Sequence, residues 1–85
     1  PVNATQQALM KIWANLLGTQ INGIDANFFD LGGHSLLATQ LTFQINKAFN
    51  VSLPMNVIFG TPTIEGIALA IDSLQKNHQS GAASL

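Results

Sequence analysis

The chain has 85 residues, of which 47% are hydrophobic and 8% are charged, and its net charge is -1. This length allows one small domain and leaves no room for a large internal catalytic cleft. The positive charges are three scattered lysines with no arginine, a pattern that argues against nucleic-acid binding because it offers no basic stripe for a phosphate backbone.

The chain contains no cysteine, and no apolar run approaches the roughly 20 residues of a membrane span. Disulfides and thiolate metal ligands are therefore excluded, and any thiol chemistry must come from an imported group. We expect a cytoplasmic protein with no membrane contact and no metal site. Because the chain starts with Pro1 and ends in the polar stretch "NHQSGAASL", it reads as one module of a longer protein.

The first predicted helix begins after Asn3, because Asn3 and Gln6 have the spacing of a capping box, and Gly18 ends it. Its apolar residues recur at helical spacing: Leu9, Ile12, Trp13, Leu16 and Leu17. Residues 18–34 show no period and are rich in Gly, Asn and Asp, which predicts a long loop. A loop of this length needs attachment to the core, and the expected pins are Ile21, Ile24, Phe28 and Phe29.

A second helix is predicted over residues 35–49. At about 100° per residue, one side of this helix is a core stripe that consists of Leu37, Ala38, Leu41, Ile45, Ala48 and Phe49. Leu36 and Phe43 fall together on the opposite side. We therefore expect two large apolar side chains in solvent.

Two further helices are predicted after residue 53. A short one has Pro54 at its first position and is closed by Gly60, and the last has Thr61 as N-cap with Pro62 in its first turn. The last helix keeps an apolar face of Ile64, Ile67, Ala68, Ile71 and Leu74. No segment alternates like a strand, so the expected fold is a small all-α four-helix bundle, with three main helices, one short helix and a long first loop.

The stretch "DLGGHSLLATQL", residues 30–41, raises the question of what Ser35 does. "GHSLL" resembles the nucleophile elbow G-x-S-x-G, but Leu37 replaces the second glycine and no strand precedes it. His34 and His78 are both poorly placed as a general base, which leaves a small serine hydrolase as a remote alternative. A second alternative is that Ser35 is simply a helix N-cap.

A third interpretation makes Ser35 the attachment point of a phosphate-linked group. The N-terminal end of a helix offers free N–H donors and the positive end of the helix dipole. Gly32 and Gly33 clear space for a modifying enzyme, and the exposed Leu36 and Phe43 form a docking patch for partners. This interpretation also explains the two glycines and the exposed leucine, which a helix cap does not.

At these residues the sequence resembles the peptidyl carrier (thiolation) domains of nonribosomal peptide synthetases. The resemblance spans residues 4–76, in "KIWANLLG", in "NFFDLGGHSLLATQL" around the serine and in "LPMNVIFGTPTIEGIA". It implies a non-catalytic, acyl-carrier-protein-like bundle over residues 1–76, with a linker at 77–85. It also implies that Ser35 receives 4'-phosphopantetheine from coenzyme A through a magnesium-dependent transferase, and that the thiol of this arm holds aminoacyl or peptidyl thioesters.

The resemblance also implies partners: a phosphopantetheinyl transferase and the adenylation, condensation and thioesterase domains of the synthetase, with the isolated domain monomeric. "GGHS" is similar to the peptidyl-carrier form, and an acyl carrier of a polyketide or hybrid synthase is the alternative. The second helix contains no acidic residue, so we expect apolar docking. The expected motif and docking residues are Asp30, Leu31, Gly32, Gly33 and His34 beside Ser35, and Leu36, Phe43, Met55 and Phe59 around them.

Two motif residues keep alternatives open. His34 is either a solvent-facing contact for the transferase or a synthetase domain, or a residue that merely fits the loop. Asp30 either caps a turn or faces the transferase. Met55 and Phe59 are expected to be partly exposed beside the arm, the alternative being ordinary burial. Trp13 is expected to pack in the core or in a semi-exposed position, the alternative being a platform for a ligand.

Overall fold

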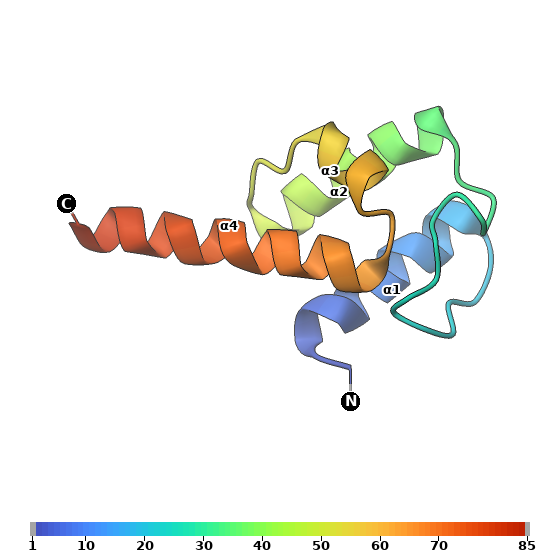
Figure 1. The fold of residues 1–85 in the computed structure, drawn as a ribbon, viewed down its shortest axis with the longest axis horizontal. Helices are drawn as coiled ribbons and strands as arrows, with labels where there is room; N and C mark the ends of the chain where they lie inside the picture. Colours follow the sequence, from blue (N-terminus) through green and yellow to red (C-terminus); the bar gives the residue numbers. More distant parts are fainter. Residues whose placement is uncertain (1, 85) are drawn as a thin grey trace.

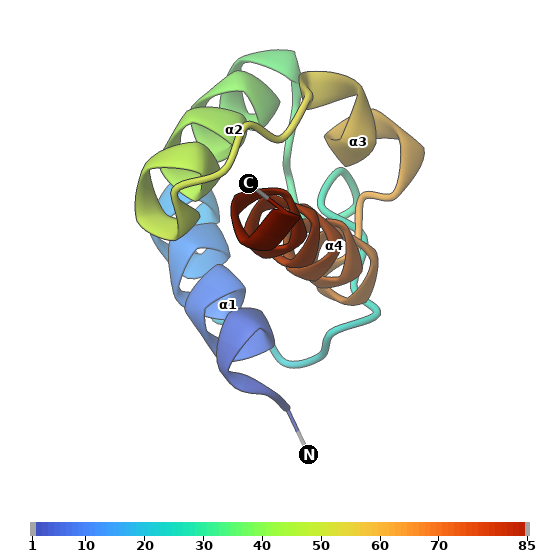
Figure 2. The ribbon, with the colours of Figure 1, turned by 90° about the vertical axis from the view of Figure 1, so that its left-hand side faces the viewer.

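The computed structural model describes residues 2–84, and the side chains of residues 2–76. It contains four helices in this range, α1 (Ala4–Leu17), α2 (Ser35–Phe49), α3 (Met55–Gly60) and α4 (Ile64–Ser84). α1 packs against α2 and α4, and the short α3 bridges α2 and α4 (Figures 1 and 2). The predicted all-α bundle with three main helices, one short helix and a long first loop is confirmed.

The capping box at the start of α1 is formed as predicted. The Gln6 amide donates to Asn3 Oδ1 at 2.8 Å, and the Gln6 side chain accepts from the Asn3 backbone at 3.1 Å. Both bonds satisfy backbone donors that the first helical turn leaves without partners. At the other end, Gly18 adopts the left-handed conformation and its N–H bonds Ala14 O, so the helix stops where the sequence predicts.

The long loop between α1 and α2 is held down by its apolar side chains. Ile21 and Phe28 are buried, and Ile24 and Phe29 are half-buried against the core, as predicted for the pins. Phe28 packs edge-on against Trp13 of α1, with ring centroids 5.1 Å apart. Its backbone N–H also bonds Pro62 O at 2.7 Å, which ties the loop to the segment before α4. The loop is therefore fixed from two sides just before it reaches Ser35.

The starts of α3 and α4 differ from the predictions by one or two residues. Pro54 is the N-cap of α3, one position outside the helix, rather than its first residue. At α4 the cap is Thr63, whose Oγ1 accepts from the Gly66 N–H at 3.1 Å, and not Thr61. Thr61 instead packs its side chain where a Cβ on Gly66 would be, so the glycine makes room for the α3–α4 turn.

Among the described residues, the core side chains of the bundle are apolar apart from the indole N–H of Trp13, which is buried and has no hydrogen-bond partner there. The predicted face of α4 is confirmed: Ile64, Ile67, Ala68 and Ile71 are buried and Leu74 is half-buried. On α2, Ala38, Leu41 and Ile45 are buried, and Leu37 and Phe49 are half-buried. Ala48 was expected in this stripe and is exposed, because it lies at the stripe's edge and faces a surface groove beside α1.

The segment predicted as a linker begins at residue 77, within the residues that α4 covers. The helical backbone of α4 continues through it to Ser84 (Figure 1), while its side chains lie outside the described residues. Within the described residues, no helix is long and apolar enough to cross a membrane, and no three His, Asp or Glu side chains gather as a metal site would require.

Candidate functional site

Ser35 is the first residue of α2 and its side chain is exposed. The N-cap position belongs to His34, which has an extended backbone and makes no side-chain capping bond. The N-cap alternative for Ser35 is therefore wrong, because Ser35 already lies inside the helix. Among the described residues, Ser35 Oγ makes no hydrogen bond, and it is free to react with a group from solvent.

The first turn of α2 has unsatisfied backbone donors. No side chain accepts from the N–H groups of Ser35, Leu36 or Leu37 within the described part of the chain, whereas the first turn of α1 has a complete capping box. Helix N-termini bind anions because such N–H groups and the helix dipole both favour negative charge. The residues at this end of α2 thus fit a phosphodiester on Ser35.

The two glycines before His34 have conformational and packing roles. Gly32 has a φ of 108°, a left-handed value that side chains disfavour. A Cβ on Gly33 would collide with the Phe28 ring and lie 2.7 Å from the Phe28 carbonyl oxygen, which accepts from the Gly33 N–H at 3.0 Å. The sequence predicts that both glycines clear space for a modifying enzyme. The structure shows that they let the loop fold tightly over Phe28 and deliver Ser35 to the helix start.

Asn27, which the sequence analysis did not single out, organises the turn before these glycines. Its Oδ1 accepts from the N–H groups of Phe29 and Asp30, at 2.8 and 3.2 Å. Asn27 thus occupies the capping role that was one alternative for Asp30, whose side chain is exposed. An asparagine that accepts from the amide two residues later is the known pattern of an Asx turn, so the signal was present in "NFFD". Leu31 is half-buried against the core.

Thr39 links the attachment end of α2 to α3. Its Oγ1 lies 3.0 Å from the Ser35 carbonyl oxygen and 3.3 Å from Met55 Sδ. Phe59 of α3 stacks on Phe29 of the loop, with ring centroids 5.5 Å apart. Met55 and Phe59 remain 38% and 45% exposed, as predicted. The loop, the start of α2 and α3 therefore form one continuous surface around Ser35.

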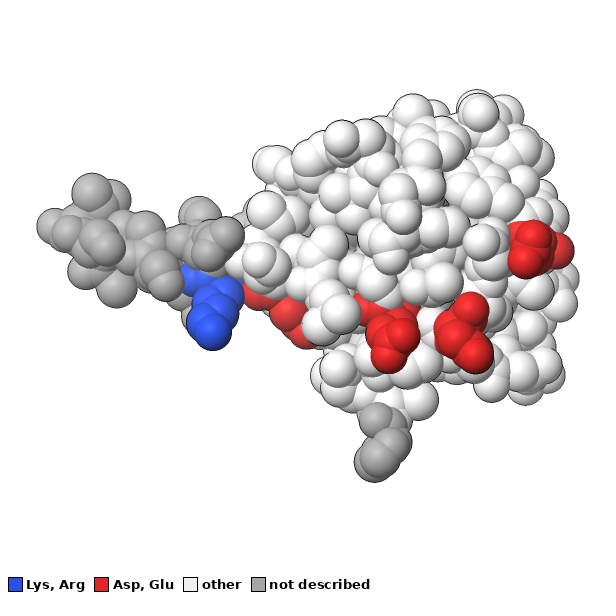
Figure 3. All heavy atoms as spheres, in the orientation of Figure 1, with Lys and Arg blue, Asp and Glu red and all other residues white. Residues whose placement is uncertain are grey.

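Leu36 and Phe43 are the expected exposed pair on α2. Their side chains are 63% and 68% exposed, so the predicted orientation is confirmed. Leu69 on α4 is exposed to a similar extent, 66%. Figure 3 shows a face of the molecule on which most side chains are uncharged and acidic side chains lie over the loop and α4. The four acidic residues are Asp25, Asp30, Glu65 and Asp72, so the surface of α2 carries no acidic group.

The geometry does not support nucleophilic catalysis by Ser35. His34 is exposed and makes no side-chain hydrogen bond in the described part of the chain, and no polar side chain there is buried. The side chain of His78 lies outside the described residues. A serine nucleophile needs a base within hydrogen-bond reach of its hydroxyl, and Ser35 has none among the described residues.

Comparisons with known proteins agree with the geometry. The family model "Phosphopantetheine attachment site" matches residues 7–71. Tyrocidine synthase 3 of Brevibacillus parabrevis is 44% identical over 85 residues, which is all of this chain and 1% of that protein. The chain therefore spans a very small part of the curated relatives it matches.

Solved structures show the same fold. A chain in the structure of the phosphopantetheine transferase Sfp in complex with coenzyme A and a peptidyl carrier protein matches with a TM-score of 0.82 and 38% identity, covering 86% of this chain and 95% of that one. The solution structure of PCP, a prototype for the peptidyl carrier domains of modular peptide synthetases, matches with a TM-score of 0.75 and 40% identity, covering 85% and 95%. The chain therefore belongs to the phosphopantetheine attachment-site family and, within it, to the non-catalytic peptidyl carrier domains of nonribosomal peptide synthetases.

Proposed function

We propose that Ser35 is the residue of this carrier domain that bears 4'-phosphopantetheine, and that the arm carries aminoacyl and peptidyl groups as thioesters between catalytic domains. The observation that carries the assignment is an exposed serine hydroxyl, free of hydrogen bonds to described residues, at an uncapped helix N-terminus. The arm would supply the thiol that this cysteine-free chain lacks.

Attachment requires one bond to form and one to break. Ser35 Oγ loses its proton to a base of the transferase and attacks the phosphorus that bears pantetheine in coenzyme A. The Oγ–P bond forms as the bond to adenosine 3',5'-bisphosphate breaks. This chain would contribute the hydroxyl of Ser35 and the free backbone amides of Ser35, Leu36 and Leu37, which would stabilise the negative charge of the phosphodiester.

The partners of this site follow from its surface. We propose that a phosphopantetheinyl transferase approaches over Asp30 and His34, and that adenylation, condensation and thioesterase domains dock on Leu36, Phe43, Met55 and Phe59. Because α2 has no acidic residue, burial of these apolar side chains supplies most of the affinity. The absence of cysteine suits a reducing compartment, and we propose that the protein is cytoplasmic. We also propose that the domain is monomeric when isolated and that it ends near residue 76.

Mass spectrometry tests the attachment directly. Incubation of the domain with coenzyme A, magnesium and a broad-specificity transferase is expected to add the mass of one phosphopantetheine. Fragmentation is expected to place the added mass on Ser35. Added mass on another residue, or an unmodified product after prolonged incubation, would refute the assignment.

Truncation of the docking side chains is expected to separate docking from folding. Leu36→Ala and Phe43→Ala should each slow loading of the holo domain by a cognate adenylation domain about fivefold or more, since central apolar anchors often contribute above ~1 kcal/mol. Their melting temperatures should stay close to that of the wild type, because both side chains are largely in solvent.

Leu69→Ala is the matched control for these variants. Leu69 is equally exposed but lies on α4, so its truncation should leave the loading rate unchanged. Equal loading rates for wild type, Leu36→Ala and Phe43→Ala would show that partners dock elsewhere. A large fall in the melting temperature of Phe43→Ala would assign that ring to the core.

A further inference from the structure

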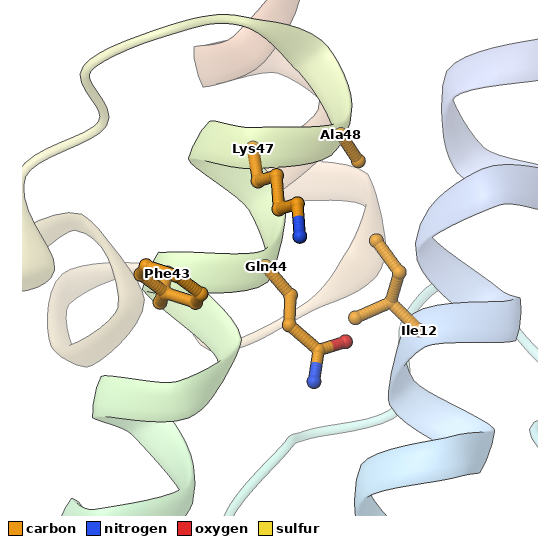
Figure 4. Close-up of a pocket in the computed structure, with 5 residues that line it drawn as sticks. All are labelled: Ile12, Phe43, Gln44, Lys47 and Ala48. Carbon is orange, nitrogen blue, oxygen red and sulfur yellow. The ribbon is translucent and has the colours of Figure 1, made fainter.

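A groove lies on the surface of α2 and extends to α1. Its volume is about 590 Å³, and it is lined by Ile12, Phe43, Gln44, Lys47 and Ala48. Figure 4 shows Ile12 of α1 facing Gln44 and Ala48 of α2, with Lys47 above Gln44 and Phe43 on the side away from Ile12. The volume falls within the range of roughly 300–1,000 Å³ that small-molecule sites occupy.

The residues that line the groove determine which chemical groups it can bind. Ile12, Phe43 and Ala48 present carbon surface, and Lys47 places one ammonium group among them. None of the lining residues is acidic, so nothing in the lining neutralises that charge. The groove, whose remaining lining residue Gln44 is polar and uncharged, therefore suits an aliphatic group better than a cationic one.

The position of the groove brings it within reach of a chain attached at Ser35. Phe43 lies eight residues after Ser35, which is about 12 Å along the helix axis at ~1.5 Å per residue. The pantetheine arm has about as many chain atoms as four or five amino-acid residues, so it spans roughly 15 Å when extended. Leu36 and Phe43 lie about 20° apart on the helix projection and are both exposed on the side of α2 that runs from Ser35 to the groove, with the exposed polar residues Thr39 and Gln40 between them.

We propose that this groove takes up the side chain of the carried group, with a preference for uncharged aliphatic cargo. The inference rests on the proposed attachment of the arm to Ser35. It also gives the exposed side chains of Leu36 and Phe43 a second role, which is to contact the arm. An arm that lies across these two side chains covers part of the surface proposed for docking. Partner binding then displaces the cargo from the groove and makes it available to the partner.

The experiment compares cargos on the same arm by methyl NMR. A transferase loads the domain from coenzyme A analogues whose pantetheine arm carries N-acetylleucyl or N-acetyllysyl through a stable amide, and the empty holo domain serves as reference. With the leucyl cargo, the Ile12 and Ala48 methyl resonances are expected to shift and to show contacts with the leucine methyls. The lysyl cargo should give at most half that effect, since an exposed charge interaction changes populations by up to about fivefold.

Charge reversal in the groove sharpens the test. Lys47→Glu is expected to increase the shifts of the Ile12 and Ala48 methyl resonances with the lysyl cargo at least about twofold. Lys11→Glu is the control and should leave these shifts unchanged, because Lys11 is an exposed residue of α1 outside the groove lining. The buried Ile71 methyl on α4 reports any general change in the fold.

Three results would overturn the inference, and they are distinguishable. Unchanged Ile12 and Ala48 methyls in a domain whose Ser35 is fully loaded by mass would exclude cargo binding in the groove. Equal effects of the two cargos would exclude the proposed preference. A domain whose Ser35 takes up no arm would refute the proposed attachment itself, which the mass measured before the NMR experiment reveals.

Discussion

Ser35→Ala is expected to abolish phosphopantetheine transfer completely, because the substitution removes the only atom of this residue that can form the bond to phosphorus. The variant should add no mass under conditions that fully convert the wild type. It should also be unable to accept an amino acid from an adenylation domain, since the chain has no other thiol.

The same substitution is expected to leave the fold intact. Ser35 Oγ is exposed and makes no hydrogen bond among the described residues, and alanine is a better helix former than serine. Melting curves of wild type and variant should therefore agree within a few degrees. Ser52→Ala is the matched control, because Ser52 is also exposed but lies in the loop between α2 and α3, and this variant should be modified at the wild-type rate. Modification of Ser35→Ala would show that another residue carries the arm.

The second large effect concerns the core. Leu41→Ala and Ile67→Ala are each expected to lower the free energy of unfolding by about 2–5 kcal/mol, because both side chains are fully buried and their truncation leaves a cavity. The loss is a large fraction of the ~5–15 kcal/mol that holds a small domain together. Chemical denaturation monitored by the fluorescence of the single, buried Trp13 measures it.

Leu69→Ala provides the comparison on the same helix as Ile67. Its side chain is 66% exposed, so the expected change is within about 0.5 kcal/mol of wild type. If Leu41→Ala and Ile67→Ala unfolded at the same denaturant concentration as wild type, the assignment of the buried helix faces would be wrong.

Periodicity was sufficient to predict the helices and most of their faces. Local signals decide such features, because a capping box needs only Asn3 and Gln6, and an apolar stripe needs only residues three and four apart. The same reasoning placed Leu36 and Phe43 in solvent, since their positions on the helix follow from the period alone. The resemblance around Ser35 identified the family because a long, specific motif surrounds the serine.

The caps of α3 and α4 were placed one or two residues too early. Thr61 and Thr63 both satisfy the sequence preference for an N-cap, and Pro62 between them is compatible with the start of a helix. Thr63 caps α4 because contacts with the loop and with α4 fix the positions of residues 61–63. Asn27 pairs with Thr63 in a β-bridge, and Thr61 fills the space beside Gly66.

The reasons for the two glycines and the surroundings of Ser35 also depended on tertiary contacts. A side chain on Gly33 would collide with the ring of Phe28, which packs edge-on against Trp13 of α1. The approach of Met55 to Thr39, and the groove that leaves Ala48 exposed, depend on how α3 and α1 lie against α2. The sequence by itself therefore determined the helices, their apolar faces and the family, because these follow from residues close together in the chain. Only the tertiary structure decided which threonine caps α4, why Gly33 must be a glycine and where a groove opens, because these depend on residues that folding brings together.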